Sequence, residues 1–340
     1  MRAFRLVGWQ KPPEMQEVPV PAPGPDEVLV EVAAVGLCHT DIHFLHAPEG
    51  AYPYPMPFTL GHEIAGRVVA VGTSAMRTAI DDTVAVALGP RCWRCLPCLR
   101  GEDNNCIGRS NGRGWGQDGG LAQYVAVPAR EVVPLRTLDP VLAAPLTDAG
   151  VTAYHAVRRV SPKLRGASTT VVIGVGGLGG FAVQYLRQLT SSRIIAIDSA
   201  PAKLARATAL GADVVLDAAD ASSDALRELS HGLGAEVILD FVGIDATMNL
   251  ALASARIGGS IAIVGAGGGT APIGWGRMPI NCDVFIPMGG VTADLHDVVA
   301  MAEAGRLQID VEQFTFAQVL EGYQRVEDGT VAGRAVVTMH

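Results

Sequence analysis

Four cysteines lie within fifteen residues of the chain and could together bind one metal ion. They follow the spacing C-x2-C-x2-C-x7-C, as Cys92, Cys95, Cys98 and Cys106. Four thiolates on one short loop can complete a tetrahedron around zinc, which leaves no position for water or substrate. An iron–sulfur cluster is the alternative, but the bacterial cluster spacing ends in C-x3-C-P, which is absent here. We therefore expect a closed zinc site that stabilises the loop, with the reactive chemistry elsewhere.

Three other segments carry side chains that could form an open metal site. GLCHTDIH contains Cys38–His43, TLGHEIAG contains His62 and Glu63, and PLTDAGVT contains Asp148. Taken singly, each is a weak indication. A lone buried cysteine is usually a core residue, and a lone aspartate before a helix is usually an N-cap. These residue types alone therefore leave open whether the segments meet at a metal.

A glycine-rich turn could bind the pyrophosphate of a dinucleotide. Gly174, Gly176 and Gly179 occupy the G-x-G-x-x-G positions, between an apolar β-branched run and a helical pattern. The glycines allow a tight turn and a close approach of the backbone, and the helix N-terminus offers N–H groups to the anion. Asp198 follows at the end of the next expected strand and could accept hydrogen bonds from ribose hydroxyls. Since a carboxylate repels a 2′-phosphate and no arginine follows directly, we predict NAD over NADP.

The composition is that of a folded protein of about two domains. The chain has 340 residues, of which 49% are hydrophobic and 18% are charged. Its formal net charge of −8, without a Lys- or Arg-rich cluster, argues against nucleic-acid binding. No segment resembles a membrane span, and the first residues lack the apolar core of a signal peptide. We therefore expect a cytoplasmic protein, in which cysteine clusters bind metal more often than they form disulfides.

The hydrophobic pattern changes near residue 150 and predicts two kinds of architecture. The first part has short apolar runs such as Val28–Val32 and Ile64–Val71, typical of a barrel-like, mostly antiparallel domain. The next part alternates strands with helices, beginning with Thr170–Ile173, Leu178–Leu189 and Arg193–Ile197, which indicates an α/β fold with a parallel sheet. From about residue 290 we expect a helix, a loop, a second helix and a last strand, Arg334–Thr338.

Together, the motifs resemble those of one enzyme family. GLCHTDIH, GHE, the four-cysteine loop, APLTDAGVT and GVGGLG occur in this order, as in the medium-chain zinc-dependent alcohol dehydrogenases. The resemblance covers nearly the whole chain and is strongest with bacterial NAD-dependent secondary alcohol dehydrogenases. It implies a GroES-like barrel catalytic domain from residues 1–148 and 288–340, and a Rossmann NAD-binding domain from residues 149–287.

The resemblance implies two zinc ions per subunit. Cys38, His62 and Asp148 match the three ligands of a catalytic zinc, whose fourth position stays open. This sequence departs from many relatives, which have a cysteine where Asp148 stands. A carboxylate and a thiolate carry the same charge, so the change keeps the site neutral with Zn²⁺. Glu63 matches a residue that can approach the metal, and the four-cysteine loop matches the structural zinc site.

The resemblance also assigns roles around the metal and the cofactor. Asp41 matches a carboxylate that orients the zinc-bound histidine, and Thr40 and His43 match a proton relay to water. The residues it implies for cofactor binding are His39, Thr152, Gly174, Gly176, Gly177, Leu178, Gly179, Asp198, Lys203, Val242, Val264 and Arg334.

The implied activity is reversible hydride transfer between NAD and an alcohol or carbonyl compound, a small-molecule substrate. The resemblance implies a primary or, preferably, a secondary alcohol. We expect it to have a medium-length chain or an aryl group, because the segments near the site contribute apolar and aromatic residues. These residues are Leu88, Trp115, Tyr52, Tyr54 and Trp275. A polyol or amino-alcohol dehydrogenase is the alternative. A zinc-free reductase or a non-catalytic NAD-binding protein would lack the intact ligand set. Relatives form dimers or tetramers, so we expect a homo-oligomer, with Val284–Ile286 as the candidate pairing strand.

Overall fold

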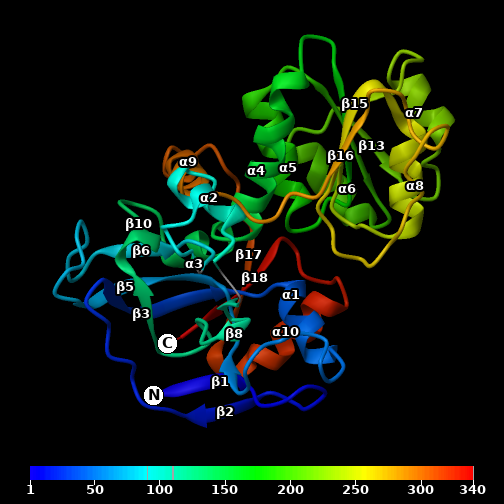
Figure 1. Cartoon of the computed structure of the whole chain (residues 1–340). Helices are drawn as coiled ribbons and strands as arrows, with labels where there is room; N and C mark the ends of the chain where they lie inside the picture. Colours follow the sequence, from blue (N-terminus) through cyan, green and yellow to red (C-terminus); the bar gives the residue numbers. More distant parts are fainter. Residues whose placement is uncertain (90, 109–110, 340) are drawn as a thin grey trace. The chain divides into compact units, whose positions relative to one another are not determined.

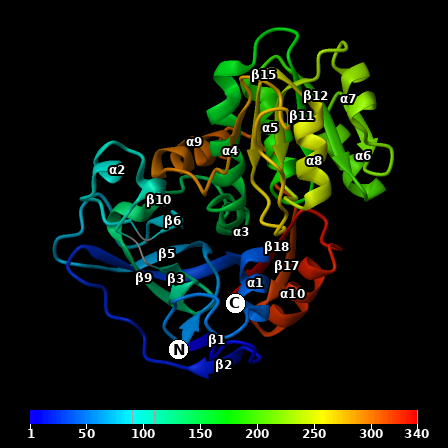
Figure 2. The same cartoon turned by 45° about the vertical axis from the view of Figure 1, so that its right-hand side comes forward.

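The computed structural model describes residues 1–89, 91–108 and 111–339, and the chain divides into two compact units. Unit 1 comprises Met1–Val151 and Gly290–His340, and unit 2 comprises Thr152–Gly289 (Figures 1 and 2). The chain therefore leaves unit 1 once and returns to it at Gly290. Among the helices of the described residues, none combines the length and the apolar character needed to cross a bilayer.

Unit 1 consists mainly of antiparallel β-sheet. Its seven-stranded sheet has the order β10-β6-β5-β3-β18-β17, with β9 also paired to β3, and a smaller sheet has the order β2-β1-β4. The short strands β7 and β8 form a separate pair. The strands are β1 (Arg2–Leu6), β2 (Glu14–Glu17), β3 (Glu27–Gly36), β4 (Phe58–Thr59), β5 (Glu63–Val71), β6 (Thr83–Val86), β7 (Gly112–Arg113), β8 (Gly116–Gln117), β9 (Tyr124–Pro128), β10 (Val132–Pro134), β17 (Val311–Thr315) and β18 (Arg334–Thr338).

Strand β3 organises this unit. It pairs antiparallel with β5, β9 and β18, so strands from the beginning and the end of the sequence share one sheet. Seven of its ten residues are buried and the other three are partly buried. Among the described residues, six helices belong wholly or partly to unit 1: α1 (His39–His46), α2 (Leu96–Leu99), α3 (Pro140–Ala143), α4 (Ala149–Val160), α9 (Thr292–Glu303) and α10 (Val319–Glu327).

Unit 2 is a parallel sheet with helices on both faces. The strand order is β13-β12-β11-β14-β15-β16, which is the order 3-2-1-4-5-6 of doubly wound dinucleotide-binding folds. Figure 1 shows α5 on one side of this sheet and α7 and α8 on the other. The elements are β11 (Thr169–Ile173), α5 (Gly179–Leu189), β12 (Arg193–Asp198), α6 (Pro201–Ala209), β13 (Val214–Asp217), α7 (Ser223–Leu229), β14 (Ala235–Asp240), α8 (Asp245–Ser254), β15 (Ala255–Ile263) and β16 (Asp283–Phe285).

The fold class expected from the sequence is confirmed, with one local difference. The segment between the last two helices, expected to be a loop, contains β17. The sequence of β17 is largely polar, and the strand exists because it pairs in parallel with β18 along its whole length. Strand formation here depends on a tertiary partner rather than on local hydrophobic pattern.

Candidate active site

The four residues Cys38, His62, Glu63 and Asp148 come together in unit 1. One ligand atom from each lies within 4.8 Å of the others. The Nε2 atom of His62 is 3.3 Å from Asp148 Oδ2, and the Cys38 sulfur is 3.7 Å from the same oxygen. Zinc bonds of about 2.0–2.3 Å in a tetrahedron place two ligand atoms roughly 3.3–3.8 Å apart. The donor set therefore fits a single tetrahedral metal ion.

Sheet register explains why the first two ligands are neighbours. Gly36, at the end of β3, pairs with Glu63, at the start of β5, in antiparallel register. The residues just beyond this pair, Cys38 and His62, therefore emerge at the same edge of the sheet. Cys38 also caps α1, because its sulfur accepts a hydrogen bond from the Thr40 N–H at 3.5 Å.

The Asp41 carboxylate orients His62 for metal binding. Its Oδ1 lies 3.2 Å from Nδ1 of His62, and both side chains are completely buried. This contact leaves Nε2 directed toward Asp148 and Cys38, as a zinc ligand requires. Burial by itself lowers the pKa of His62, but the charge of Asp41 and hydrogen bonds donated by the His62 ring to Asp148, Asp41 and Cys38 raise it well above its ordinary value.

Glu63 forms an ion pair with Arg334, which opposes the approach of its carboxylate to a metal. Its Oε1 accepts a hydrogen bond from Arg334 Nη2 at 2.5 Å, and Arg334 also donates to the Leu37 carbonyl at 3.0 Å. Burial raises the pKa of Glu63 to about 7, even though the Arg334 charge lowers it. Arg334, expected from the resemblance to contact a phosphate, is thus seen as the ion-pair partner of Glu63; its phosphate role stays a prediction.

The two proposed relay residues lie on one side of α1. Thr40 Oγ1 is 3.5 Å from the Cys38 sulfur, so its hydroxyl lies beside the ligand set. His43 follows three positions later and is exposed, as is His39. Residues three apart on a helix are neighbours, so this placement is compatible with proton transfer from the site to water.

The four sulfurs of the cysteine loop form a compact cluster. Cys95 Sγ lies 3.5 Å from Cys98 Sγ and 3.9 Å from Cys106 Sγ, and Cys92 lies 4.0 Å from Cys98. Zinc–sulfur bonds of about 2.3 Å place the sulfurs of a tetrahedron roughly 3.8 Å apart, whereas a cluster of several irons would separate them further. The geometry therefore fits one zinc ion.

The loop backbone also favours thiolates. Backbone hydrogen bonds from Arg94 and Cys95 lower the pKa of Cys92 to about 6, while burial raises the pKa of Cys98 to about 12. One bound cation would hold all four sulfurs as thiolates, because metal binding releases thiol protons.

In unit 2 the predicted cofactor residues gather at the carboxyl ends of the parallel strands. Gly174 has φ +80°, and a Cβ on Gly179 would lie 1.9 Å from the Gly174 carbonyl, so both positions require glycine. A Cβ on Gly176 would meet nothing within 4 Å, which leaves the turn open to a ligand.

Asp198 also stabilises the glycine turn through hydrogen bonds. One of its carboxylate oxygens accepts from the Val175 N–H at 2.9 Å and the other from the Ala200 N–H at 3.0 Å. Other residues in the predicted set lie nearby in the topology: Val242 and Val264 follow β14 and β15, and Lys203 is on α6. Doubly wound sheets bind ligands at this edge, between β11 and β14, where the strand order reverses.

Sequence analysis missed one residue beside the candidate zinc ligands. Tyr323, on α10, is buried against Asp41, whose charge helps to raise the pKa of its hydroxyl after the larger effect of burial. No local motif marks this tyrosine. Trp115 lies with its ring 5.3 Å from the His62 ring, as a residue lining the substrate site would. Trp275, grouped with it from the sequence, lies in unit 2 with 94% of its surface exposed.

Comparison with known proteins agrees with both units. Residues 24–137 match the family model described as alcohol dehydrogenase GroES-like domain, and residues 177–301 match the one described as zinc-binding dehydrogenase. An NAD-dependent alcohol dehydrogenase of Sulfurisphaera tokodaii is 33% identical over 99% of both chains. A D-arabinose 1-dehydrogenase (NADP(+)) of Saccharolobus solfataricus is 31% identical over 99% of this chain and 97% of its own.

The solved structures give the same result. The crystal structure of the alcohol dehydrogenase from Aeropyrum pernix matches with a TM-score of 0.93 and 32% identity, and the match covers 100% of both chains. With full-length relatives above 30% identity and both family models in sequence order, the chain belongs to the zinc-binding, medium-chain alcohol dehydrogenase family of oxidoreductases.

Proposed function

We propose that the protein is an NAD-dependent alcohol dehydrogenase whose catalytic zinc is bound by Cys38, His62 and Asp148. The observation that supports this most directly is the spacing of the three donor atoms, which suits a tetrahedral ion with one position left for substrate. When bound, zinc would supply Lewis acidity toward an alcohol hydroxyl, and NAD would accept the hydride. A second zinc in the four-cysteine loop would stabilise that loop.

The protein residues then have to hold the metal and remove a proton. Cys38 and Asp148 contribute two negative charges, so the site is neutral overall with Zn²⁺. Asp41 fixes the orientation of His62, and Thr40 receives the substrate proton for transfer through His43 to water. In this proposal Glu63 stays away from the metal while its carboxylate is paired with Arg334.

Asp198 supports NAD as the cofactor. Its carboxylate has lone pairs left to accept from ribose hydroxyls, although both oxygens already accept backbone hydrogen bonds. The following residues, Ser199, Ala200 and Pro201, offer no cation for a 2′-phosphate.

For the substrate we propose a medium-chain or aryl alcohol, with secondary alcohols preferred. Trp115 beside His62 favours an apolar substrate group near the metal. The D-arabinose dehydrogenase relative favours a polyol or sugar as the second candidate. A screen of primary, secondary, aryl and polyol alcohols with NAD and NADP separates the two.

The decisive experiment combines metal analysis with turnover. The purified protein should contain about two zinc ions per chain and reduce NAD with an alcohol. Cys38→Ser should remove one zinc and abolish turnover, while Glu102→Gln, an exposed change on the cysteine loop, should affect neither. Full activity in Cys38→Ser, or in protein free of metal, would refute the zinc mechanism.

We also propose that the chain forms a cytoplasmic homodimer or homotetramer through the edge strand β16. All six cysteines are free, which suits a reducing compartment. Exposed apolar side chains, Ile286 at 76% and Met288 at 53%, follow β16 directly. Ile286→Glu should shift the mass measured by light scattering to that of a smaller species; a monomeric wild-type protein would contradict the proposal.

A further inference from the structure

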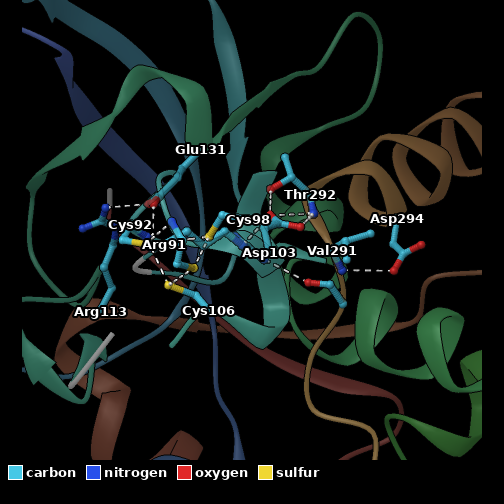
Figure 3. A network of polar contacts seen from close by, with 12 residues as sticks. Arg91, Cys92, Cys98, Asp103, Cys106, Arg113, Glu131, Val291, Thr292 and Asp294 are labelled. Atoms are coloured by element: carbon cyan, nitrogen blue, oxygen red, sulfur yellow. Dashed lines mark hydrogen bonds and ion pairs between the residues drawn. The ribbon is translucent and has the colours of Figure 1, made fainter. Parts of the chain in front are cut away.

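The cysteine loop carries a buried carboxylate that binds the start of a distant helix. Asp103 lies between Cys98 and Cys106, and only 3% of its surface is exposed. Its oxygens accept hydrogen bonds from the Thr292 N–H at 3.1 and 3.2 Å and from the Thr292 hydroxyl at 2.5 Å (Figure 3). Thr292 is the first residue of α9 and lies 189 positions further along the chain.

Helix α9 does not supply this acceptor itself. The residue that precedes it is Val291, whose side chain has no oxygen to accept a hydrogen bond, and Asp294 in the first turn accepts from the Val291 N–H at 3.0 Å. The N–H groups of a first turn have no partner within their own helix. Asp103 accepts a hydrogen bond from the Thr292 N–H and places a negative charge at the N-terminal end of the helix dipole, where it is favourable.

Arg91 connects the same loop to the point where the chain re-enters unit 1. It directly precedes Cys92, and its Nε lies 2.6 Å from Asp103 Oδ2. Its Nη2 donates to the carbonyl of Gly290 at 2.9 Å, and Gly290 is the first residue of the returning segment. The Arg91 backbone N–H donates to Glu131 at 3.3 Å, which fixes the start of the loop against the barrel.

The sulfurs and these charged groups share one short stretch of backbone. The Cys106 N–H donates to the Asp103 carbonyl at 3.2 Å, and the Cys92 N–H donates to the Cys106 sulfur at 3.3 Å. Helix α2 of this loop has only four residues, so the loop has little regular structure of its own to hold Asp103 in place. Asp103 and Arg91 are thus connected to the four sulfurs through a few residues of backbone.

We propose that metal binding by the four cysteines stabilises residues 290–294, through Asp103 and Arg91, and so anchors the returning segment of the chain. The inference rests on the metal proposed for the cysteine loop, but not on the proposed reaction. The side chains of Arg91 and Asp103 are 3% and 4% exposed, so this ion pair is hardly screened by water. Because such coupling is reciprocal, a change at Thr292 must also weaken metal retention in the loop.

The first test measures the zinc affinity of the loop. Competition with a chelating indicator is measured in a Cys38→Ala background, so that only loop zinc is observed. Thr292→Val removes the hydroxyl bond to Asp103 without touching a cysteine, and Asp103→Asn removes the charge. A lost hydrogen bond to a charged group corresponds to a change of about tenfold or more in an equilibrium constant, so both variants should bind zinc at least that much more weakly. Glu102→Gln, an exposed neighbour on the same loop, should bind zinc with the parent affinity.

The second test measures the helix start by hydrogen exchange of residues 290–296. Cys95→Ser should speed exchange there by about tenfold or more, and Asp103→Asn should do the same with the loop zinc still present. In the double variant Cys95→Ser/Asp103→Asn, the increase in exchange rate should be smaller than the product of the two single increases, because both changes break the same connection. Folded Thr292→Val protein with unchanged zinc affinity overturns the coupling even if Cys95→Ser fails to fold. Protein that contains no loop zinc at all refutes the metal proposal instead, and with it this inference.

Discussion

Glu63 and Arg334, which are 271 positions apart, form a buried ion pair beside the candidate zinc ligands. The side chain of Glu63 is 0% exposed and that of Arg334 is 8% exposed, so water screens neither charge. The second Glu63 oxygen, Oε2, is buried without a hydrogen-bond partner among the described residues. The pair thus holds the Glu63 carboxylate within reach of the metal site, and Arg334 competes with a metal ion for this carboxylate.

Removing the arginine should destabilise the protein in a pH-dependent way. Arg334→Met leaves Glu63 as an unpaired buried carboxyl group and should lower the free energy of unfolding by about 3–5 kcal/mol at pH 8. Burial already raises the Glu63 pKa to about 7, from 4.5, and loss of the arginine raises it further. Because the pKa of Glu63 is higher in the folded than in the unfolded protein, stability is lost as pH rises from the unfolded pKa through the folded pKa. The stability deficit of Arg334→Met should therefore be small near pH 5.

Urea unfolding at both pH values measures the effect of Arg334→Met. Adding Glu63→Gln should restore much of the loss at pH 8, because no charge then remains to be buried. The matched control is Arg325→Met, which breaks a partly exposed pair with Glu312 and should cost no more than about 1 kcal/mol. A deficit of equal size at both pH values would show that packing, not charge, is responsible.

Gly36 should tolerate no side chain, because it makes room for the Glu63 carboxylate. A Cβ at this position would lie 1.9 Å from Glu63 Oε2 and 2.9 Å from Glu63 Cβ. Gly36→Ala should therefore cost about 1–3 kcal/mol and displace the carboxylate toward the metal ligands, with weaker zinc binding as a result.

Thermal unfolding and zinc titration of Gly36→Ala measure these two effects. In a Glu63→Ala background, Gly36→Ala should cost much less than it does in the wild type, since only the Cβ contact remains. Gly166→Ala is the control, because a Cβ there meets nothing within 4 Å. Normal stability and normal zinc affinity in Gly36→Ala would contradict the predicted clash.

Asp198 should determine cofactor choice. Asp198→Gly combined with Ser199→Arg removes the acceptor for the ribose hydroxyls and adds a cation for a 2′-phosphate. The ratio of kcat/KM for NAD to that for NADP should fall by at least about tenfold, the scale of one lost hydrogen bond to a charged group. Asp198→Asn is the companion variant, since it can keep one backbone contact of the turn. An unchanged ratio in the double variant would mean that Asp198 only braces the turn.

Metal uptake at the open site should strengthen as pH rises. In the metal-free protein the Asp41 charge, acting against burial, raises the pKa of His62 well above 6.5, and this proton must leave before Nε2 binds zinc. The charged His62 stabilises the metal-free fold below pH 6.5, and this contribution disappears as pH rises through the raised folded pKa. The increase in Tm caused by zinc should therefore grow from pH 6 to pH 8.

Scanning calorimetry with and without zinc at pH 6, 7 and 8 tests the pH dependence of metal uptake. Asp41→Asn removes the charge that raises the His62 pKa, and should flatten the dependence. A zinc-induced shift of the same size at pH 6 and pH 8 in the wild type would refute the role assigned to His62.

Features whose partners lie close together along the chain could be predicted before the fold was known. The cysteine loop closes within fifteen residues, and the glycine turn requires only one strand, one helix and Asp198 at the end of the next strand. The chemistry of the loop and of the turn can be predicted because the spacing of their residues is enough to bring the relevant atoms together. The alternation of strands and helices in unit 2 likewise follows from hydrophobic pattern and gave the correct fold class.

Tertiary structure alone decided the contacts that join distant segments. Cys38 and His62 meet because Gly36 pairs with Glu63, and Arg334 reaches Glu63 because β18 pairs with β3. Asp103 reaches Thr292 only because the chain returns to unit 1 at Gly290. Family resemblance implied that Cys38 and His62 share a metal, but it paired neither Arg334 with Glu63 nor Asp103 with Thr292. Strand order and register place such side chains together, and no short stretch of sequence encodes either.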